Sequence, residues 1–113
     1  MTKKERKQLY EGMYILNSTL SEEATKKALD KIIGGITEKG GEVLKVFDQG
    51  RKKIAYEIKK KKEGHYFILY FKLNTQSINQ LWKEYHLNED LLRFMTLGVN
   101  VVPEKIEFQK LSD

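Results

Sequence analysis

The sequence predicts an α+β fold of the ferredoxin-like kind, with elements in the order β-α-β-β-α-β. Two segments with apolar residues at helical spacing stand between segments that alternate apolar and polar residues. The chain therefore consists of two successive β-α-β units. Units of this length build a four-stranded antiparallel sheet with two helices on one face. The other face of such a sheet stays open, and we expect the function of the chain there.

Length and composition limit the classes to which the chain can belong. A chain of 113 residues is expected to form a core without disulfides or metal ions. It has no cysteine, which excludes thiolate zinc sites and cysteine nucleophiles and is typical of a reducing compartment. No apolar run approaches about 18 residues, so we expect no membrane span. We expect a domain over residues 10–99, a basic extension over residues 1–9 and a polar tail over residues 100–113.

The first β-α pair is expected to end at two glycines. Residues 10–16 alternate between two faces, as in a strand. Ser21 offers an N-cap for the helix that follows, and Gly40-Gly41 ends this helix. Gly34-Gly35 lies inside the helix, where each glycine weakens it by about 1 kcal/mol relative to alanine. Close packing on the sheet would explain this pair, and early fraying of the helix is the alternative.

Two strands, a helix and a last strand follow. The second strand begins at Glu42 and is interrupted at Asp48-Gln49-Gly50, where we expect a bulge or kink. Glu63-Gly64 is expected to close a turn. The third strand has apolar residues on both faces, so we expect it in the middle of the sheet. The remaining expected elements are a helix that starts at Asn74 or Thr75 and ends at residues 87–88, and a strand over residues 91–99.

Signals for catalysis and for metal binding are absent from the sequence. Neither His65 nor His86 has a second histidine or a carboxylate pair at ligand spacing, so we expect no metal site. Nucleotide-binding glycine motifs are also absent. The acylphosphatases, which are enzymes of this topology, need a phosphate-binding loop after the first strand, and residues 17–20 have no glycine or arginine for one. We therefore expect no enzyme, no catalytic residue, no cofactor and no small-molecule substrate.

Basic and aromatic residues gather in one segment, residues 50–73. This segment carries eight of the 21 Lys and Arg residues and five of the 11 Tyr and Phe residues. The net charge of +5 suggests a polyanionic partner, and the clustering favours this interpretation over a merely solvated surface. Because a positive hairpin with aromatic residues can hold a phosphate backbone and stack a base, we expect a nucleic-acid partner.

Three groups of residues in this segment are candidates for the site. We expect a kink at Gly50 to turn Arg51, Lys52 and Lys53 outward together, and arginine adds bidentate phosphate contacts. A row of Tyr66, Ile68 and Tyr70 is either a stacking platform or a docking face for another protein. The hairpin tip is expected either to reach a groove or to prevent edge-to-edge aggregation. Its lysines are Lys59, Lys60, Lys61 and Lys62.

Motifs in the first strand, the hairpin and the last strand occur in a recognisable order. Residues 10–17 read Tyr-Glu-Gly-Met-Tyr-Ile-Leu-Asn, and residues 50–59 read Gly-Arg-Lys-Lys-Ile-Ala-Tyr-Glu-Ile-Lys. A glycine and an aromatic strand follow at residues 64–71, and Arg93 lies inside the last strand. In this order the motifs resemble those of the bacterial small-subunit ribosomal protein S-six family over roughly residues 10–99. Departures from the usual residues occur at Gln49, Lys53 and Ile54.

The resemblance implies a non-catalytic role in the small subunit of a cytoplasmic ribosome. It also implies that the chain binds the central domain of the small-subunit ribosomal RNA together with ribosomal protein S-eighteen. Two sets of residues carry over from the family by position. The RNA contacts would be Arg51, Lys52, Lys53 and Arg93, of which Arg93 is indicated by the resemblance alone, and the residues that shape the site would be Tyr10, Glu11 and Tyr56.

Two other kinds of domain share this topology. An RNA-recognition-motif domain binds single-stranded RNA, and residues 13–17 imitate its first-strand motif, whereas residues 62–66 imitate only part of its third-strand motif. This alternative requires Tyr14 on the open face, where it would stack on a base. The S-six resemblance instead places Tyr14 on the covered face with Leu16. A small-molecule-sensing regulatory domain would need a glycine-rich ligand loop, which the sequence does not show.

Overall fold

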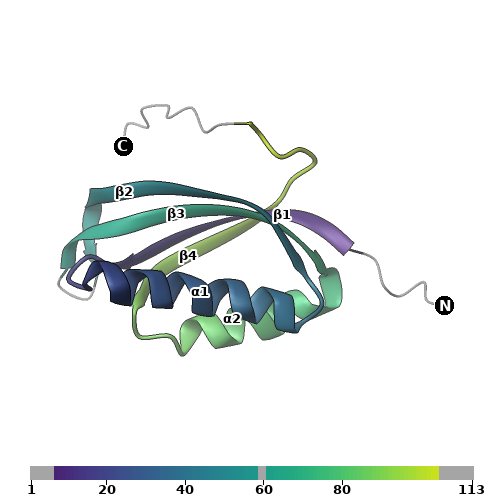
Figure 1. Ribbon diagram of the computed structural model, residues 1–113, viewed down its shortest axis with the longest axis horizontal. Helices are drawn as coiled ribbons and strands as arrows, with labels where there is room; N and C mark the ends of the chain where they lie inside the picture. The colour runs from purple at the N-terminus through teal and green to yellow at the C-terminus, as the bar shows by residue number, and fades with distance from the viewer. Residues whose placement is uncertain (1–6, 59–60, 105–113) are drawn as a thin grey trace.

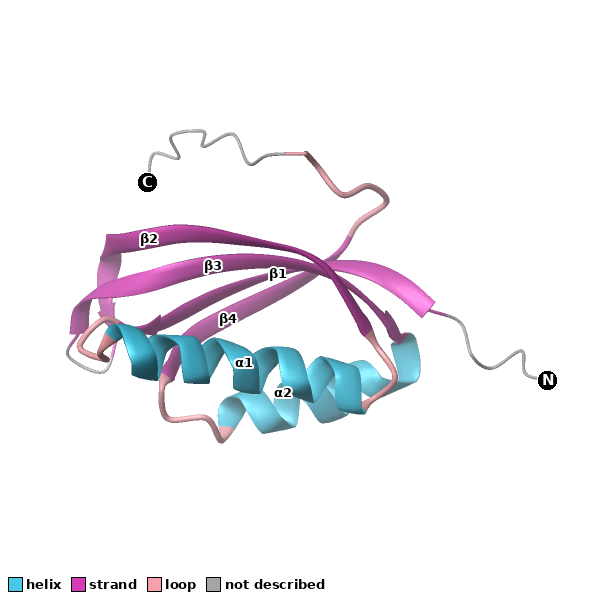
Figure 2. Cartoon of the chain, in the orientation of Figure 1, coloured by secondary structure: helices cyan, strands magenta, loops and turns pink. Residues whose placement is uncertain are grey.

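The computed structural model describes residues 7–58 and 61–104, which form an antiparallel sheet with two helices on one of its faces (Figures 1 and 2). The strand order is β2-β3-β1-β4. The elements are β1 (Lys7–Asn17), α1 (Glu22–Glu38), β2 (Glu42–Ile58), β3 (Lys61–Asn74), a 3-10 turn (Thr75–Ser77), α2 (Ile78–His86) and β4 (Leu91–Gly98). The predicted ferredoxin-like fold is confirmed. Within the described part of the chain, no helix has the length and hydropathy to cross a membrane.

The two central strands are β1 and β3. The register pairs β3 with β2 on one side and with the whole of β1 on the other, which confirms its predicted central place. On its other edge, β1 pairs with β4 from Tyr10 to Leu16. The first and the last strand of the chain are therefore neighbours.

The core fills the space between the sheet and the helices. We call this side of the sheet the covered face and the opposite side the open face. Alternate residues of β1 and β3 point into the core, as the period of two requires. The largest fully buried side chains are Tyr14, Leu16, Ile32, Ile36, Leu69, Phe71, Leu73 and Leu81. Burial of each such apolar side chain contributes about 1.5–3 kcal/mol relative to exposure.

Tyr14 separates the two RNA-binding alternatives. Its side chain is 0% exposed, and its hydroxyl oxygen lies 2.7 Å from the hydroxyl oxygen of Tyr85 on α2. It therefore lies on the covered face, where it cannot stack on a base. The position that the recognition-motif alternative requires is wrong for this chain.

Caps at both ends of α1 are as expected. The Ser21 hydroxyl accepts a hydrogen bond of 3.0 Å from the backbone N–H of Ala24, and Glu22 and Glu23 lie on the positive end of the helix dipole. At the other end, Gly40 has a φ of 83°, a conformation that glycine adopts at little cost. These residues therefore define where the helix begins and ends.

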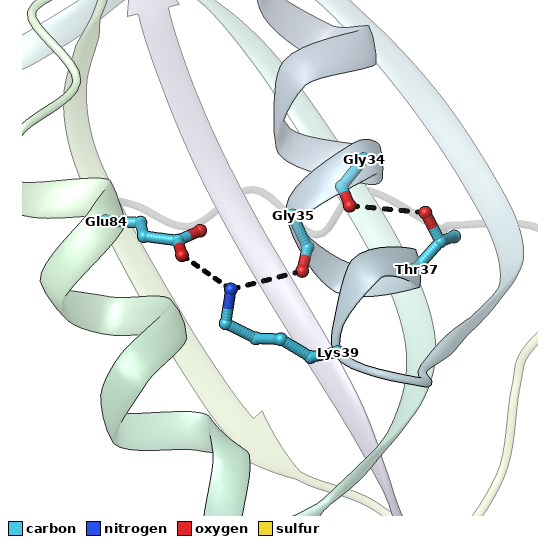
Figure 3. Close-up of polar contacts among 5 residues, drawn as sticks. All are labelled: Gly34, Gly35, Thr37, Lys39 and Glu84. Atoms are coloured by element: carbon cyan, nitrogen blue, oxygen red, sulfur yellow. Dashed lines mark hydrogen bonds and ion pairs between the residues drawn. The ribbon is translucent and has the colours of Figure 1, made fainter.

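Of the glycine pair inside α1, only Gly35 packs closely, and it does so against α2 rather than on the sheet (Figure 3). A Cβ atom at Gly35 would lie 3.2 Å from Glu84 Oε1 and 3.5 Å from Leu81 Cδ1, whereas one at Gly34 would meet nothing within 4 Å. Lys39 Nζ lies 2.6 Å from Glu84 Oε2 and 3.5 Å from the carbonyl oxygen of Gly35 (Figure 3). The expected packing of this pair on the sheet is wrong, because a smooth helix surface at Gly35 serves the contact between the two helices.

Glu63-Gly64 lies inside β3, so the expected turn at this position is wrong. β2 ends at Ile58 and β3 begins at Lys61. A Cβ atom at Gly64 would overlap Cγ2 of Ile15 and would lie 3.2 Å from the carbonyl oxygen of Leu16. The glycine therefore permits the close approach of β1.

Candidate nucleic-acid interface

The bulge at Asp48-Gln49-Gly50 sets the direction of the basic side chains that follow. The pairing of β2 with β3 shifts register between Asp48 and Gly50, and Gly50 has a φ of 79°. The Asp48 carboxylate accepts a hydrogen bond of 2.9 Å from the Gly50 N–H. This arrangement confirms the predicted bulge and absorbs an extra residue in β2.

Arg51 and Lys52 point to opposite sides of the sheet. Arg51 is paired with His65 and lines a cavity beside α1 on the covered face. Lys52 lies on the open face, where its Nζ is 5.7 Å from the ring centroid of Tyr66. The expectation that a kink turns them outward together is wrong, because ordinary strand alternation resumes after the bulge.

Lys52 and Arg93 stand on either side of Tyr66 in a row across the open face. Tyr66 on β3 and Arg93 on β4 are both register partners of Ile15 on β1. We call Lys52, Tyr66, Ile15 and Arg93 the open-face row. Since adjacent strands lie about 4.8 Å apart, the row extends about 14 Å from β2 to β4. Two cations thus flank an aromatic ring and a buried apolar side chain.

Partial burial favours the neutral form of the Tyr66 hydroxyl in this row. Partial burial raises the pKa of Tyr66, and the positive charge of Arg93 partly offsets this rise. Burial also lowers the pKa of the Lys52 amine. An anion beside Lys52 would favour its charged form. The row therefore offers an uncharged stacking surface between groups that attract phosphate.

A cavity of about 600 Å³ on the covered side receives Arg51. The lining also contains a second cation, Lys26, and two negatively charged carboxylates, those of Glu22 and Asp48. His65 Nε2 lies 2.7 Å from Asp48 Oδ1, and the His65 ring stacks on Phe67 with centroids 4.6 Å apart. These contacts give His65 a structural role. Among the residues that the structure describes, no group of three or more His, Asp or Glu side chains is placed to hold a metal ion.

Tyr10 and Glu11 lie away from the open-face row. Tyr10 is on the covered face and stacks on Phe71, with ring centroids 5.5 Å apart. Glu11 is on the open face, where it accepts a hydrogen bond from the hydroxyl of Tyr70. Its register partner Tyr70 is four positions from Tyr66 along β3, which corresponds to about 13 Å. The structure brings together Lys52 and Arg93 but not these two residues.

The comparisons with known proteins agree on one family. The family model described as ribosomal protein S6 matches residues 9–98. The chain belongs to the ribosomal protein S6 family. The predicted resemblance is thereby confirmed, and the chain is a protein of the small ribosomal subunit.

Relatives of the S6 family match over the full length. Small ribosomal subunit protein bS6 of Chlamydia pneumoniae is 58% identical over 113 residues, which cover 100% of both chains. The bS6 protein of Chlamydia muridarum (strain MoPn / Nigg) is 56% identical over 111 residues, or 98% of this chain and 99% of the relative. These relatives are bacterial ribosomal proteins, so the predicted location on a cytoplasmic ribosome is confirmed.

A solved S6 structure has the same fold. The crystal structure of 30S ribosomal protein S6 from Thermotoga maritima matches with a TM-score of 0.78 and 30% sequence identity. The match covers 83% of this chain and 89% of that chain. The ferredoxin-like architecture is thus the architecture of an S6 protein.

For several predicted site residues of this S6 chain, the structure describes neither the side chain nor, at residues 59–60, the backbone. Lys53 is described and is exposed opposite Glu63. β2 continues to Ile58, and the ladder pairs Ile58 with Lys61. The predictions for the side chains of the five remaining residues stay predictions. These residues are Tyr56, Lys59, Lys60, Lys61 and Lys62.

Tyr66 is the residue that sequence reasoning underrated. The alternation in β3 places Tyr66, Ile68 and Tyr70 on one face, but it does not show which of them has cations beside it. That depends on the register of β3 with β1 and of β1 with β4. Tyr70 is only 4% exposed and bonds to Glu11, so it is not available as a stacking surface.

Proposed function

We propose that the chain is a non-catalytic constituent of the small subunit that binds the central domain of the small-subunit ribosomal RNA together with ribosomal protein S-eighteen. We assign the binding to the domain over residues 10–99. The observation that carries the proposal is the open-face row, in which Lys52 and Arg93 flank Tyr66. Cations on both sides of an aromatic ring suit a phosphate backbone with an adjacent base.

The other basic residues extend this surface around the hairpin. Arg51 adds a bidentate phosphate donor on the covered side, and Lys53 is exposed beside it. The row contacts one stretch of RNA, while Arg51, Lys53 and the lysines at positions 59–62 reach another. Tyr10 and Glu11 contribute through the shape of β1 rather than by touching phosphate, and Tyr56 extends the hairpin.

The first test measures salt dependence. Binding of the purified protein to a central-domain RNA fragment is measured over a salt series, for the wild type and for Lys52→Ala plus Arg93→Ala. Two lost phosphate contacts should reduce the slope of log K against log salt by about 1.4–1.8, from about 0.7–0.9 per contact. The matched control is Lys31→Ala plus Lys83→Ala, which removes the same charge from exposed positions on the two helices. Equal slopes for the two double variants would remove the row from the site.

The second test concerns the protein partner. The same RNA fragment is titrated with and without ribosomal protein S-eighteen. Tight binding that requires S-eighteen supports the proposal and assigns part of the interface to protein. Tight binding to any single strand, indifferent to S-eighteen, would favour recognition of single-stranded RNA instead.

A further inference from the structure

The chain beyond β4 crosses the open face. The backbone N–H of Val99 donates to the carbonyl oxygen of Leu9 on β1 over 3.0 Å. Five residues later, the carbonyl oxygen of Glu104 accepts a hydrogen bond of 3.4 Å from Lys45 Nζ on β2, the far edge of the sheet. Figure 1 shows this segment turning back over the sheet on the side away from the helices. The tail that follows therefore starts on the open face beside β2.

The surface at this point is apolar. Lys45 is paired with Tyr70, and its Nζ lies 5.5 Å from the ring centroid of Phe47. The Phe47 ring meets Tyr70 edge-on, with centroids 6.0 Å apart, and its register partner is Ile68. We call Phe47, Ile68 and Tyr70 the β2 patch. Phe47 and Ile68 are half-buried, and the helices lie on the other side of the sheet.

The tail has a pattern that fits such a patch. Residues 105–113 read Lys-Ile-Glu-Phe-Gln-Lys-Leu-Ser-Asp. In an extended chain Ile106 and Phe108 share one side, while Lys105 and Glu107 share the other. Ile106 follows Glu104 by two positions, as Phe47 follows Lys45, and two extended residues span about 7 Å. Nine residues reach at most about 30 Å, so the patch is well within reach.

We propose that the C-terminal tail of this chain docks on its own β2 patch, with Ile106 and Phe108 packed on Phe47 and Ile68. The occupant is the tail rather than another molecule, because the hydrogen bond between Lys45 and Glu104 places the start of the tail at the edge of the patch. The inference does not depend on RNA binding.

The absence of cysteine permits a direct test. A nitroxide spin label is attached to the single cysteine of Gln109→Cys in the full-length chain, and the loss of amide NMR signals is recorded. We expect loss at Phe47 and Ile68 and none at Ala28 and Ile32 of α1. Loss that is uniform, or absent at Phe47 and Ile68, would overturn the proposal.

Two further variants and one mixing experiment complete the test. Ile106→Ser plus Phe108→Ser, in the labelled background, should abolish the signal loss at the β2 patch. The matched control, Lys105→Ser plus Glu107→Ser, leaves the net charge unchanged and should retain it. Loss in an isotope-labelled chain mixed with a separate spin-labelled chain would show that a second copy occupies the patch, and this would refute docking of the tail on its own sheet.

Discussion

The hydroxyl groups of Tyr14 and Tyr85 are hydrogen-bonded to each other inside the core. Their hydroxyl oxygens lie 2.7 Å apart, and their rings meet edge-on with centroids 5.3 Å apart. No buried side-chain nitrogen or oxygen in the described part of the chain is without a hydrogen-bond partner. A single truncation would therefore leave one buried hydroxyl unpaired, which costs more than the net value of the bond itself.

Phenylalanine substitutions test this pair. Tyr14→Phe and Tyr85→Phe should each lower the free energy of unfolding by about 1–3 kcal/mol. The double variant should lose less than the sum of the two, because neither hydroxyl remains to be left unpaired. Urea denaturation of the four proteins measures this coupling. Strictly additive losses would show that the two hydroxyl groups act independently.

The same tyrosines predict a loss of stability in alkali. Burial raises the pKa of both hydroxyl groups above the ordinary value of 10.0. The folded state therefore retains protons that the unfolded state releases. The stabilisation is fully present below the unfolded-state pKa of about 10 and is lost progressively as the pH rises from there through the raised folded-state pKa values. We expect the free energy of unfolding to fall above this pH, and to fall less steeply in Tyr14→Phe plus Tyr85→Phe. An identical pH profile for that variant would contradict the assignment.

At single residues, prediction from sequence worked where a local rule decides. The period of two predicted that Tyr66, Ile68 and Tyr70 share one face of their strand, and Ser21 was identifiable as a cap from its neighbours. Arg51 and Lys52 were expected on the same side of the sheet. A bulge can either change the direction of the side chains that follow it or only accommodate an extra residue. The sequence around Gly50 is the same in both cases, and only the pairing with β3 distinguishes them.

At the scale of the elements, two glycines have opposite effects. Gly64 sits where β1 approaches β3 so closely that a Cβ atom would overlap Ile15. Gly34 sits in the interior of α1 with open space around its Cα atom. The first glycine is required by packing between strands, whereas the second only loosens its helix.

Alanine substitutions should separate these roles. Gly64→Ala should lower the free energy of unfolding by about 1–3 kcal/mol, since the added methyl group forces Ile15 or the strands apart. Gly34→Ala should raise it by about 0.5–1 kcal/mol through helix propensity. Thermal unfolding of both variants provides the measurement. A stabilised Gly64→Ala protein would mean that β1 and β3 are not so closely packed.

The elements were predictable from periodicity, but their contacts were not. Glu63-Gly64 resembles a turn signal, and nothing within ten residues of it reveals that β1 lies against it. Gly34-Gly35 likewise predicts a close contact without identifying the surface. The contact is made by Gly35 and not by Gly34, and it is with α2 and not with the sheet. Local patterns identify elements, and contacts between distant segments determine which surfaces meet.

At the scale of the molecule, backbone pairing is uneven across the sheet. β1 pairs on both edges, whereas β3 is the only neighbour of β2 among the strands of the described residues. On the hairpin side of Gly64, the residues of β3 pair with β2 but have no partner in β1. Resistance to local opening should therefore be greatest in the middle of the sheet and least toward the hairpin.

Hydrogen exchange should follow this gradient. We expect the amides of residues 12–14 to be among the slowest, with exchange limited by global unfolding. The amides of residues 52–58 should exchange faster by local opening. Native-state exchange at low denaturant measures both. Equal protection in the two segments would mean that the hairpin opens only when the whole sheet does.

The fold as a whole and its family were accessible from the sequence, because two repeated β-α-β patterns and an ordered set of motifs both extend over the chain. The open-face row was not, since its members come from four strands whose registers carry no local signature. The crossing of residues 99–104 over the sheet was also missed, because a polar tail predicts no particular path.

The central place of β1 also constrains how the chain can be made. Tyr10 pairs with Gly98, so the chain must leave the ribosome as far as Gly98 before the first strand gains its last neighbour. Until β4 emerges, one edge of β1 presents unpaired amides and carbonyls to the surroundings. Such long-range closure is slow relative to helix formation. A nascent chain of this protein therefore completes its sheet only after β4 has emerged, and any pause before Leu91 prolongs the exposure of that edge.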